Sequence, residues 1–577
     1  MGPNSSLGNI TNLPLSDPKC NSDACLAFKA GHLASQAQIS WASQFLYGHY
    51  ITWYYLAIIF LAMLVYAHKL VQSRRLVSVP SNGTSVLNKA LAFVRLISYR
   101  RIHGRLANII GLPSLGMLLF VLITCLFLLL LAFIQRPYYR LHRGFGSPPL
   151  AVRTGLMAIA LTPIIVALAG KVNFITILTG ISHEKLNVLH RYASYMCLFL
   201  SIVHTVPFIV APLKDGGLKQ LHKQYYKKGG LEFTGTPPLG ILVGLCVFSI
   251  PWIRHKSYSF FYRLHIPLYV TYLGLIFWHA TQELDSWAYL WATLAIYLAS
   301  ITSRAFVKCQ SFNVLRPWFQ GYSAHLTPLS GDMTRVDVIV STDFKWKAGQ
   351  HCWLRFPHLS ILHNHPFTIA SLPKRAFSNT EKAYDDQTLR FYIRSYRGLT
   401  KALAVSTEKS DQALDRAYTI HVDGPYGGLI ADLSSRYDQL IFVAGGGGIS
   451  ACLPLMLQAA IKISQGTAST NSIHLIWMVR EEMHTEWARE ELKTVISLTE
   501  GKLCEFNFFV TDSSPAKSSL RASGAVVPSA REIQASTAAS TALGIGQLHY
   551  QRPFLLHFLP GMITGRRVMI FGKSSKD

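Results

Sequence analysis

The sequence predicts a multi-domain protein in which a helical membrane domain precedes two domains built largely from strands. Half of the 577 residues are hydrophobic and only 15% are charged, whereas a soluble chain usually carries about 25% charged residues. The long apolar runs lie in the first 305 residues, and the remainder alternates as in a soluble α/β protein. We expect four parts: an external segment at 1–50, a membrane domain at 51–305, a β-barrel domain at 306–430 and an α/β domain at 431–577.

Seven apolar stretches approach the ~20 residues that a helix needs to cross the hydrocarbon core. They are 52–67, 116–134, 154–170, 187–211, 238–253, 262–280 and 287–302. Eight lysines and arginines lie between the first two stretches, at 69–105, which favours a cytosolic position for that loop. The loops on the other side are also basic, since 214–228 holds five lysines. Seven spans with an external N-terminus would place the second half of the chain in the cytosol.

Four histidines fall at regular positions in two of these stretches. His190 and His204 lie in the fourth and His265 and His279 in the sixth, and each pair is 14 residues apart. In an α-helix, 14 residues return to within ~40° of the same face and rise ~21 Å. Both helices would start on the cytosolic side, so the first histidine of each is inner and the second outer.

Two facing helices of this kind are suited to hold two haems at two depths, His190 with His265 and His204 with His279. Two neutral imidazoles suit a six-coordinate haem that transfers electrons. One histidine in a span is more often a satisfied polar residue or a proton relay, but two equal spacings at matching depths favour metal ligation. His183 and His255 lack such partners, and we expect them to be solvated or near lipid headgroups.

Cysteines, charge and short motifs add weaker expectations. Cys20 and Cys25 would form a disulfide if the N-terminal end lies outside the cytosol. Two tripeptides beginning at Asn4 and Asn9 are glycosylation acceptors under the same condition, and no cleavable signal peptide is evident. The net charge of +26 is not accompanied by a basic stripe with interleaved aromatics, so we expect membrane lipid as the partner and no nucleic acid.

The stretches LTGISHEKLNVLHRYASY and SYSFFYRLH, with the paired histidines, resemble the fungal ferric reductases, a family related to the superoxide-generating NADPH oxidases. The resemblance covers nearly the whole chain from the first span onward. It implies a ferredoxin-reductase-like FAD domain and an NADPH-binding α/β domain. It also implies electron transfer from cytosolic NADPH through FAD and two b-type haems to extracellular Fe(III) chelates, with Cu(II) as a second acceptor. The implied place is the plasma or the vacuolar membrane, with possible iron-uptake partners.

The same resemblance implies a flavin site in the β-barrel domain. HPFT would place His365 near the FAD phosphate or ribose, Phe367 against the isoalloxazine, and Thr368 near N5. Arg394 in IRSYRGLTKAL would pair with the pyrophosphate, and a helix would begin beside it with free N–H groups. A plain barrel without a cofactor is the alternative. The expected FAD-binding residues are His365, Pro366, Phe367, Thr368, Arg394, Gly398, Leu399 and Thr400.

The NADPH site is expected where QLIFVAGGGGIS runs from a strand through glycines into a helix. Gly445, Gly446 and Gly448 fit the family's G-G-x-G turn, which permits close approach of a pyrophosphate. Arg480 ends the next strand, where a cation would favour the 2′-phosphate of NADPH; a solvated arginine is the alternative. Trp487 is a weaker candidate, and core packing is its simpler explanation.

Two segments depart from the family pattern. Residues 512–546 are rich in Ser, Ala and Thr and predict a disordered insertion. After GRRVMIFG, the family's last core strand should lead into a Cys-Gly-Pro turn beside the nicotinamide and then a helix, but Gly572 is followed by KSSKD. Hydride transfer by this version of the chain is therefore in question. The rival functions are an NADPH oxidase producing superoxide and an inactive, truncated haem membrane protein.

Overall fold

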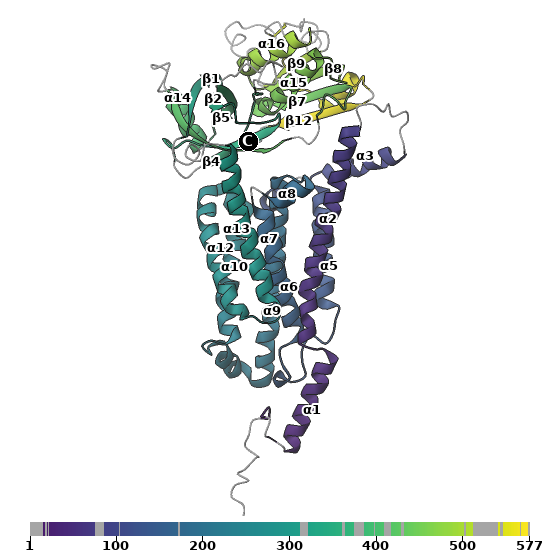
Figure 1. The fold of residues 1–577 in the computed structure, drawn as a ribbon, viewed down its shortest axis with the longest axis vertical. Coiled ribbons are helices and arrows are strands. Elements are labelled where there is room, and N and C mark those ends of the chain that lie inside the picture. The colour runs from purple at the N-terminus through teal and green to yellow at the C-terminus, as the bar shows by residue number, and fades with distance from the viewer. Residues whose placement is uncertain are drawn as a thin grey trace, which may run out of the picture. The chain divides into compact units, whose positions relative to one another are not determined.

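The computed structural model divides into two compact units, one of residues 1–69 with 80–304 and one of 305–577 with 70–79 (Figure 1). Each unit is considered by itself. The residues that the structure describes are 15–17, 20, 22–75, 86–102, 104–170, 173–311, 321–360, 364–373, 386–396, 398–408, 417–428, 432–500, 504–511, 541–542, 546–565 and 567–574. The predicted glycosylation tripeptides and nearly all of the predicted insertion at 512–546 lie outside them.

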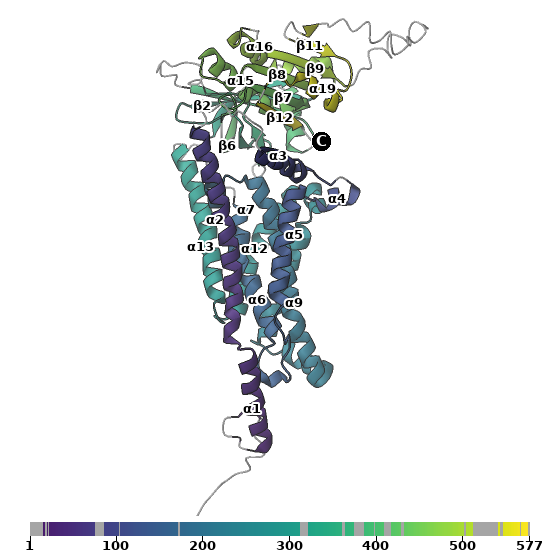
Figure 2. The ribbon, with the colours of Figure 1, turned by 90° about the vertical axis from the view of Figure 1, so that its right-hand side faces the viewer.

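The long helices of the first unit run side by side as a bundle, and α1 extends beyond one end of it (Figures 1 and 2). Its helices are α1 (Asp23–Gln38), α2 (Phe45–Arg75), α3 (Val86–Tyr99), α4 (Arg105–Ile110), α5 (Leu115–Phe133), α6 (Pro149–Ala160), α7 (Thr162–Ala169), α8 (Phe174–Thr179), α9 (His183–Tyr225), α10 (Leu231–Phe248), α11 (Pro251–Lys256), α12 (Tyr258–Ala280) and α13 (Ser286–Ser311). The third predicted stretch is split into α6 and α7, because Pro163 removes a backbone donor and limits helix continuation.

Seven helices in the described part of the chain are long and apolar enough to cross a membrane. Six of them overlap the first six predicted stretches, and the fifth stretch, 238–253, extends beyond the end of its helix at Phe248. The seventh, Gly446–Ser464, belongs to the second unit, where most of it is buried against a sheet. The predicted stretch 287–302 forms α13, which packs into the bundle through Tyr289 and Leu290. Membrane spanning by α13 stays a prediction, because polar residues follow Ala299 and lower its mean hydropathy.

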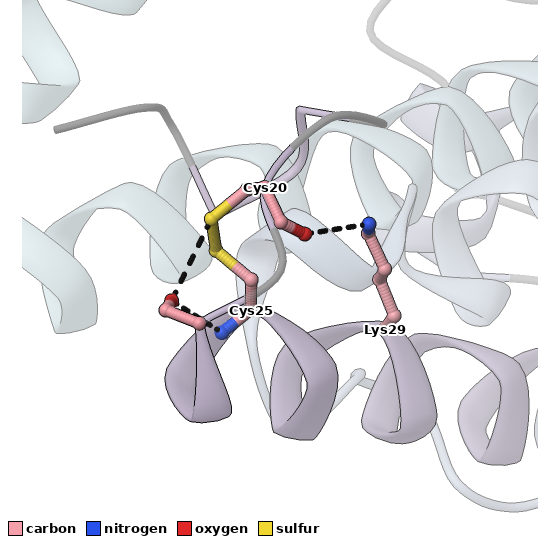
Figure 3. Close-up of a disulfide and its surroundings, with 4 residues drawn as sticks. Cys20, Cys25 and Lys29 are labelled. Carbon is pink, nitrogen blue, oxygen red and sulfur yellow. Dashed lines mark hydrogen bonds between the residues drawn. A yellow bond between two sulfur atoms is a disulfide. The ribbon is translucent and has the colours of Figure 1, made fainter. Parts of the chain in front are cut away.

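A disulfide between Cys20 and Cys25 closes the loop before α1 (Figure 3). Ser22 caps the helix by accepting a hydrogen bond from the Cys25 amide at 3.3 Å, and the Lys29 ammonium donates to the Cys20 carbonyl at 2.9 Å. Side-chain caps of this kind satisfy amides that have no partner within the helix. The predicted pairing of the two cysteines is therefore present in the structure.

The second unit begins with six antiparallel strands in the order β4-β3-β6-β1-β2-β5. They are β1 (Tyr322–Leu329), β2 (Met333–Ser341), β3 (Gln350–Arg355), β4 (Asn364–Thr368), β5 (Asp386–Arg394) and β6 (Tyr418–Gly427). Val336, Val338 and Val340 alternate toward a buried core, as expected for a strand with one solvated face. Just after β4, the Ala370 amide donates to the Arg390 carbonyl of β5 at 2.8 Å, which joins the two ends of the sheet and curls it into a barrel.

A second sheet follows, in the order β10-β11-β9-β8-β7-β12, and all its pairings except β10 with β11 are parallel. The strands are β7 (Gln439–Gly445), β8 (Ser472–Val479), β9 (Cys504–Val510), β10 (Thr541–Ala542), β11 (Gly546–His549) and β12 (Val568–Ser574). Leu440 and Phe442 face α15 (Ile449–Ser464) and α16 (Arg489–Leu498), whereas Ile441 and Val443 face α19 (Leu555–Met562). The predicted fold class, a helical membrane domain followed by an antiparallel FAD-type domain and an α/β domain, is confirmed.

Candidate functional site

The four predicted histidines form two facing pairs between α9 and α12. The ring centroids of His190 and His265 are 6.4 Å apart with an interplanar angle of 70°, and those of His204 and His279 are 6.1 Å apart at 75°. A metal–imidazole bond is about 2 Å long, so two imidazoles on opposite sides of one metal have their centroids about 6 Å apart. Both pairs therefore have the separation that a shared metal requires.

The two histidines of α9 direct the same ring nitrogen into the protein. Nδ1 of His190 donates to the Ile165 carbonyl at 2.8 Å, and Nδ1 of His204 donates to the Ala151 carbonyl at 2.7 Å. A carbonyl oxygen can only accept, so the ring proton lies on Nδ1. The Nε2 lone pair of each ring is left for a metal, and a ligand histidine normally donates its other ring N–H in this way.

The two histidines of α12 are held by hydroxyl groups of α10 and of Ser249, the residue that follows it. Nδ1 of His265 lies 3.3 Å from Ser249 Oγ, and Nδ1 of His279 lies 3.2 Å from Thr234 Oγ1. Both hydroxyl protons are already donated to backbone carbonyls, those of Leu245 and of the first turn of α10. The hydroxyl oxygens must therefore accept from the rings, which leaves the Nε2 lone pairs of these histidines free as well.

Two glycines give the outer rings their space. A methyl group on Gly155 of α6 would lie 2.6 Å from Nδ1 of His204, and one on Gly235 of α10 would lie 2.8 Å from Cε1 of His279. Any larger residue would have to displace these rings. The outer pair is thus built from four helices, two that carry the histidines and two that approach them closely.

The layer between the two pairs is formed by buried side chains, among them Cys197 and Tyr272. Cys197 and Tyr272 each lie seven residues from both histidines of their helix, and their side chains are hydrogen-bonded to each other. Cys197 also donates to the Ala158 carbonyl at 3.5 Å. No group of three or more His, Cys, Asp or Glu side chains gathers as a metal cluster in the described residues. Two protein ligands per layer suit a porphyrin, whose own nitrogens occupy the other positions.

The predicted flavin residues lie at the two ends of the curled sheet. His365, Pro366, Phe367 and Thr368 form β4, which pairs with β3 along the edge. Arg394 ends β5, and α14 (Leu399–Glu408) begins directly after Gly398, whose φ of +60° suits glycine. The Thr400 hydroxyl accepts a hydrogen bond from the Tyr396 amide at 3.1 Å and is thus turned toward its own chain. Because the two ends of the sheet meet, the motifs are brought to one side of the barrel.

The glycine turn has the predicted position between a buried strand and a helix. Gly445 ends β7, Gly446 has a φ of +52°, and α15 starts at Ile449. Trp477 of β8 donates to the Gly446 carbonyl at 3.0 Å and fixes the turn. Arg480 follows β8 and is exposed. The turn therefore leaves backbone amides at the start of α15, an arrangement suited to a pyrophosphate.

Sequence reasoning missed the polar joint between the two sheets. The Arg390 guanidinium of β5 binds Asp337 at 2.8 Å and Glu491 of α16 at 2.7 Å, and Tyr392 donates to Glu491 at 2.9 Å. Burial lowers the pKa of Arg390, but the bonds to the two carboxylates outweigh burial and raise the pKa above its usual value. No spacing rule signals a pair 101 residues apart, so only the structure reveals it.

A second contact in this joint involves residues 482–488. Trp487 is 5% exposed and donates to the Ser330 carbonyl at 2.8 Å, so core packing explains it. His484 stacks on Trp487 with ring centroids 4.5 Å apart and lies against Gly331. Burial lowers the pKa of His484; Glu481 opposes this shift, and the cations Arg394 and Arg480 reinforce it. The histidine is therefore held neutral where the two sheets meet.

Comparison with known proteins finds a family match for each of the three domains. Residues 154–276 match the family "Ferric reductase like transmembrane component", 319–429 match "FAD-binding domain", and 437–560 match "Ferric reductase NAD binding domain". The chain is 38% identical over 435 residues to a probable cell surface ferric reductase of Aspergillus oryzae, covering 74% of this chain and 57% of that protein.

It is also 33% identical over 474 residues to the ferric/cupric reductase transmembrane component 7 of Saccharomyces cerevisiae, covering 80% of this chain and 72% of the relative. The chain therefore belongs to the ferric reductase family.

Proposed function

We propose that this protein carries electrons from cytosolic NADPH across a membrane to extracellular Fe(III) chelates, in support of iron uptake. Two b-type haems would be held by the pairs His190–His265 and His204–His279. The observation that carries the proposal is the common geometry of these pairs: spacings of 6.4 and 6.1 Å and four Nδ1 atoms bonded to the protein. This geometry leaves four Nε2 lone pairs facing each other in two layers.

The remaining residues have roles in placing the other cofactors. FAD, when bound, accepts a hydride and passes its electrons on singly. His365, Phe367 and Thr368 of β4 and Arg394 of β5 would hold it at the joined ends of the sheet. Pro366, Gly398, Leu399 and Thr400 complete that set. The amides after Gly445, with Gly446 and Gly448, would receive the NADPH pyrophosphate, and Arg480 would favour its 2′-phosphate.

The disulfide at one end of the bundle supports the proposed direction of electron transfer. The Cys20–Cys25 disulfide belongs to an oxidising compartment. Arg140, in the loop before α6, donates to Ser35 and Ile39 at the end of α1, and α6 contacts His204 through Ala151. These contacts support the assignment of the His204–His279 pair as the outer one and of the His190–His265 pair as the inner one. A membrane potential that is negative inside favours outward electron flow by ~2.3 kcal/mol per charge and 100 mV.

Anaerobic reduction of the purified, haem-loaded chain tests the proposal. In liposomes, NADPH and FAD added on the side of the nucleotide domain should reduce the haems and then a ferric chelate on the other side. Reduction by dithionite but not by NADPH would refute the enzymatic function. Parallel assays in air, with and without superoxide dismutase, separate direct reduction from superoxide production, since the dismutase leaves only direct Fe(II) formation unchanged.

A further inference from the structure

The helix that carries the outer histidine continues well beyond a membrane. α9 has 43 residues, which makes it about 65 Å long, roughly twice the ~30 Å hydrocarbon core. Gly216 and Gly217 interrupt its helical geometry, with a φ of +64° at Gly217. The chain beyond this kink therefore lies outside the core, and it leads into the start of α10 at Leu231, where Thr234 and Gly235 contact His279.

This connection, residues 213–230, is strongly basic. It contains five lysines and a single carboxylate, Asp215, so its net charge is +4 with His222 neutral. All five lysines are exposed. Lys219 and Lys223 are four residues apart on one face of the helix, and two more follow in the turn before α10. The lysines of the connection are Lys214, Lys219, Lys223, Lys227 and Lys228.

The connection is placed where an electron would leave the protein. It joins α9, which carries His204, to α10, whose Thr234 and Gly235 contact His279. The ammonium of Lys214 lies 5.3 Å from the centre of the Tyr139 ring, so the neighbouring loop shares the same surface. That loop adds the exposed Arg136 to it.

Acidic groups at this end are few, and two of them are engaged. Glu232 accepts a hydrogen bond from Gln224, and Asp285 is paired with His49 at 2.7 Å. Asp215 and Glu283 are the other carboxylates of the outer connections at 134–148, 212–232 and 281–285. Together, these three connections are thus positive overall.

We propose that the lysine connection at 213–230 attracts anionic ferric chelates to the outer pair and disfavours cationic acceptors such as hydrated Cu(II). This inference rests on the proposed function and names its substrate class. Fe(III) is a hard ion kept in solution by oxygen anions such as carboxylates, so its complexes are commonly negative. A positive surface raises the encounter rate of anions by 10- to 1000-fold at low salt. Each encounter transfers one electron from the protein to Fe(III), giving Fe(II), and no bond is made or broken.

The test uses the full chain with haem in nanodiscs of uncharged phosphatidylcholine, reduced beforehand by dithionite so that NADPH is not needed. Oxidation of the haems is followed after mixing with anionic Fe(III)–EDTA or with cationic hexaammineruthenium(III), at low and high ionic strength. The variant replaces the five lysines by glutamine. The control replaces Lys89 and Arg95 of α3 by glutamine, so that two positive charges are removed on another helix than those of the outer pair.

At low ionic strength, the five-lysine variant should react with Fe(III)–EDTA at least tenfold more slowly than the parent and with the ruthenium cation faster. Both differences should shrink at high ionic strength, because salt screens exposed charges. Equilibrium dialysis with redox-inert Ga(III)–citrate should show weaker binding by the variant, and the control should match the parent in every assay.

Equal rates for variant and parent, or a change of the same sign with both acceptors, would overturn the proposal. An effect seen only in nanodiscs with anionic lipid would also overturn it, because the lysines would then bind headgroups. Failure of the parent protein to reduce either acceptor would instead count against the proposed function, and the Ga(III)–citrate binding would still report on the lysines.

Discussion

Gly155 of α6 lies directly beside the ring of His204, so close that a methyl group on it would come within 2.6 Å of Nδ1. The ring cannot turn away freely, because the same nitrogen donates to the Ala151 carbonyl at 2.7 Å. We therefore expect Gly155→Ala to displace the ring and lower stability by about 1–3 kcal/mol, as overpacked cores do. The EPR signal and midpoint potential of the outer haem should shift, and those of the inner haem should not.

Gly274→Ala in α12 is the matched control, because a methyl group there meets no atom within 4 Å. Alanine is favoured over glycine within a helix by roughly 0.5–1 kcal/mol, so this variant should be neutral or slightly stabilising. Unchanged haem signals in Gly155→Ala would contradict the tight contact between α6 and the outer ring.

Replacing either outer histidine should remove one haem and leave the other. His204→Leu and His279→Leu each leave a single imidazole in that layer, whereas the inner pair keeps both of its ligands at the observed 6.4 Å spacing. The haem-to-protein ratio from a pyridine haemochrome assay should fall by about half. His222→Leu, an exposed histidine on the same helix, should keep the full ratio. A full complement of haem in both outer variants would refute the pairing.

The joint between the two sheets should depend on Glu491 and not on its neighbour. The Glu491 side chain is 11% exposed and serves both Arg390 and Tyr392, whereas Glu490 is 79% exposed and only 4.0 Å from Arg390. Glu491→Ala leaves the half-buried Arg390 guanidinium and the buried Tyr392 hydroxyl without this partner, which costs about 1–3 kcal/mol. Glu490→Ala should change stability by less than about 0.5 kcal/mol. The measurement is the temperature at which FAD is released, followed by flavin fluorescence. Equal release temperatures for the two variants would show that the contacts of Glu491 with Arg390 and Tyr392 do not stabilise the joint.

The sequence predicted those features that repeat along one element. The 14-residue spacing of the histidines, the alternation of Val336 to Val340, and the run of glycines after β7 each follow a fixed period or order, so the fold class could be inferred. The length and apolarity of a helix did not distinguish a membrane-spanning helix from a buried one. α15 satisfies both criteria because it is buried against a sheet, and a buried helix and a spanning helix have similar compositions.

Features that depend on distant contacts could not be predicted. Nothing local in the sequence shows that Ser249 and Thr234 accept from His265 and His279, since both are ordinary helix residues until α10 packs on α12. The close approach of Gly155 to His204 has the same origin. These contacts decide which ring nitrogen carries the proton, and therefore whether a histidine can bind a metal through Nε2.

His484 should make the joint between the sheets weaken in mild acid. Its pKa is lowered in the folded protein, chiefly by burial, with Arg394 and Arg480 adding to the effect and Glu481 and Asp332 opposing it. The unfolded chain then binds more protons in this range than the folded one, so stability rises with pH. The contribution of His484 to stability is fully present at a pH above its pKa in the unfolded chain, about 6.5. It is lost as the pH falls toward the lower pKa of His484 in the folded protein.

We therefore expect the FAD-release temperature of the parent to fall between about pH 7.5 and about pH 5.5, with a smaller fall for His484→Phe. Phenylalanine keeps an aromatic face against Trp487 and cannot be protonated. His549, whose pKa is also lowered by burial and whose ring stacks on Phe509 at 4.6 Å, contributes in the same direction. His549→Phe serves as the matched variant, and the double variant should be the least sensitive to pH. An unchanged pH dependence in the double variant would show that carboxylates, and not these imidazoles, control the acid response.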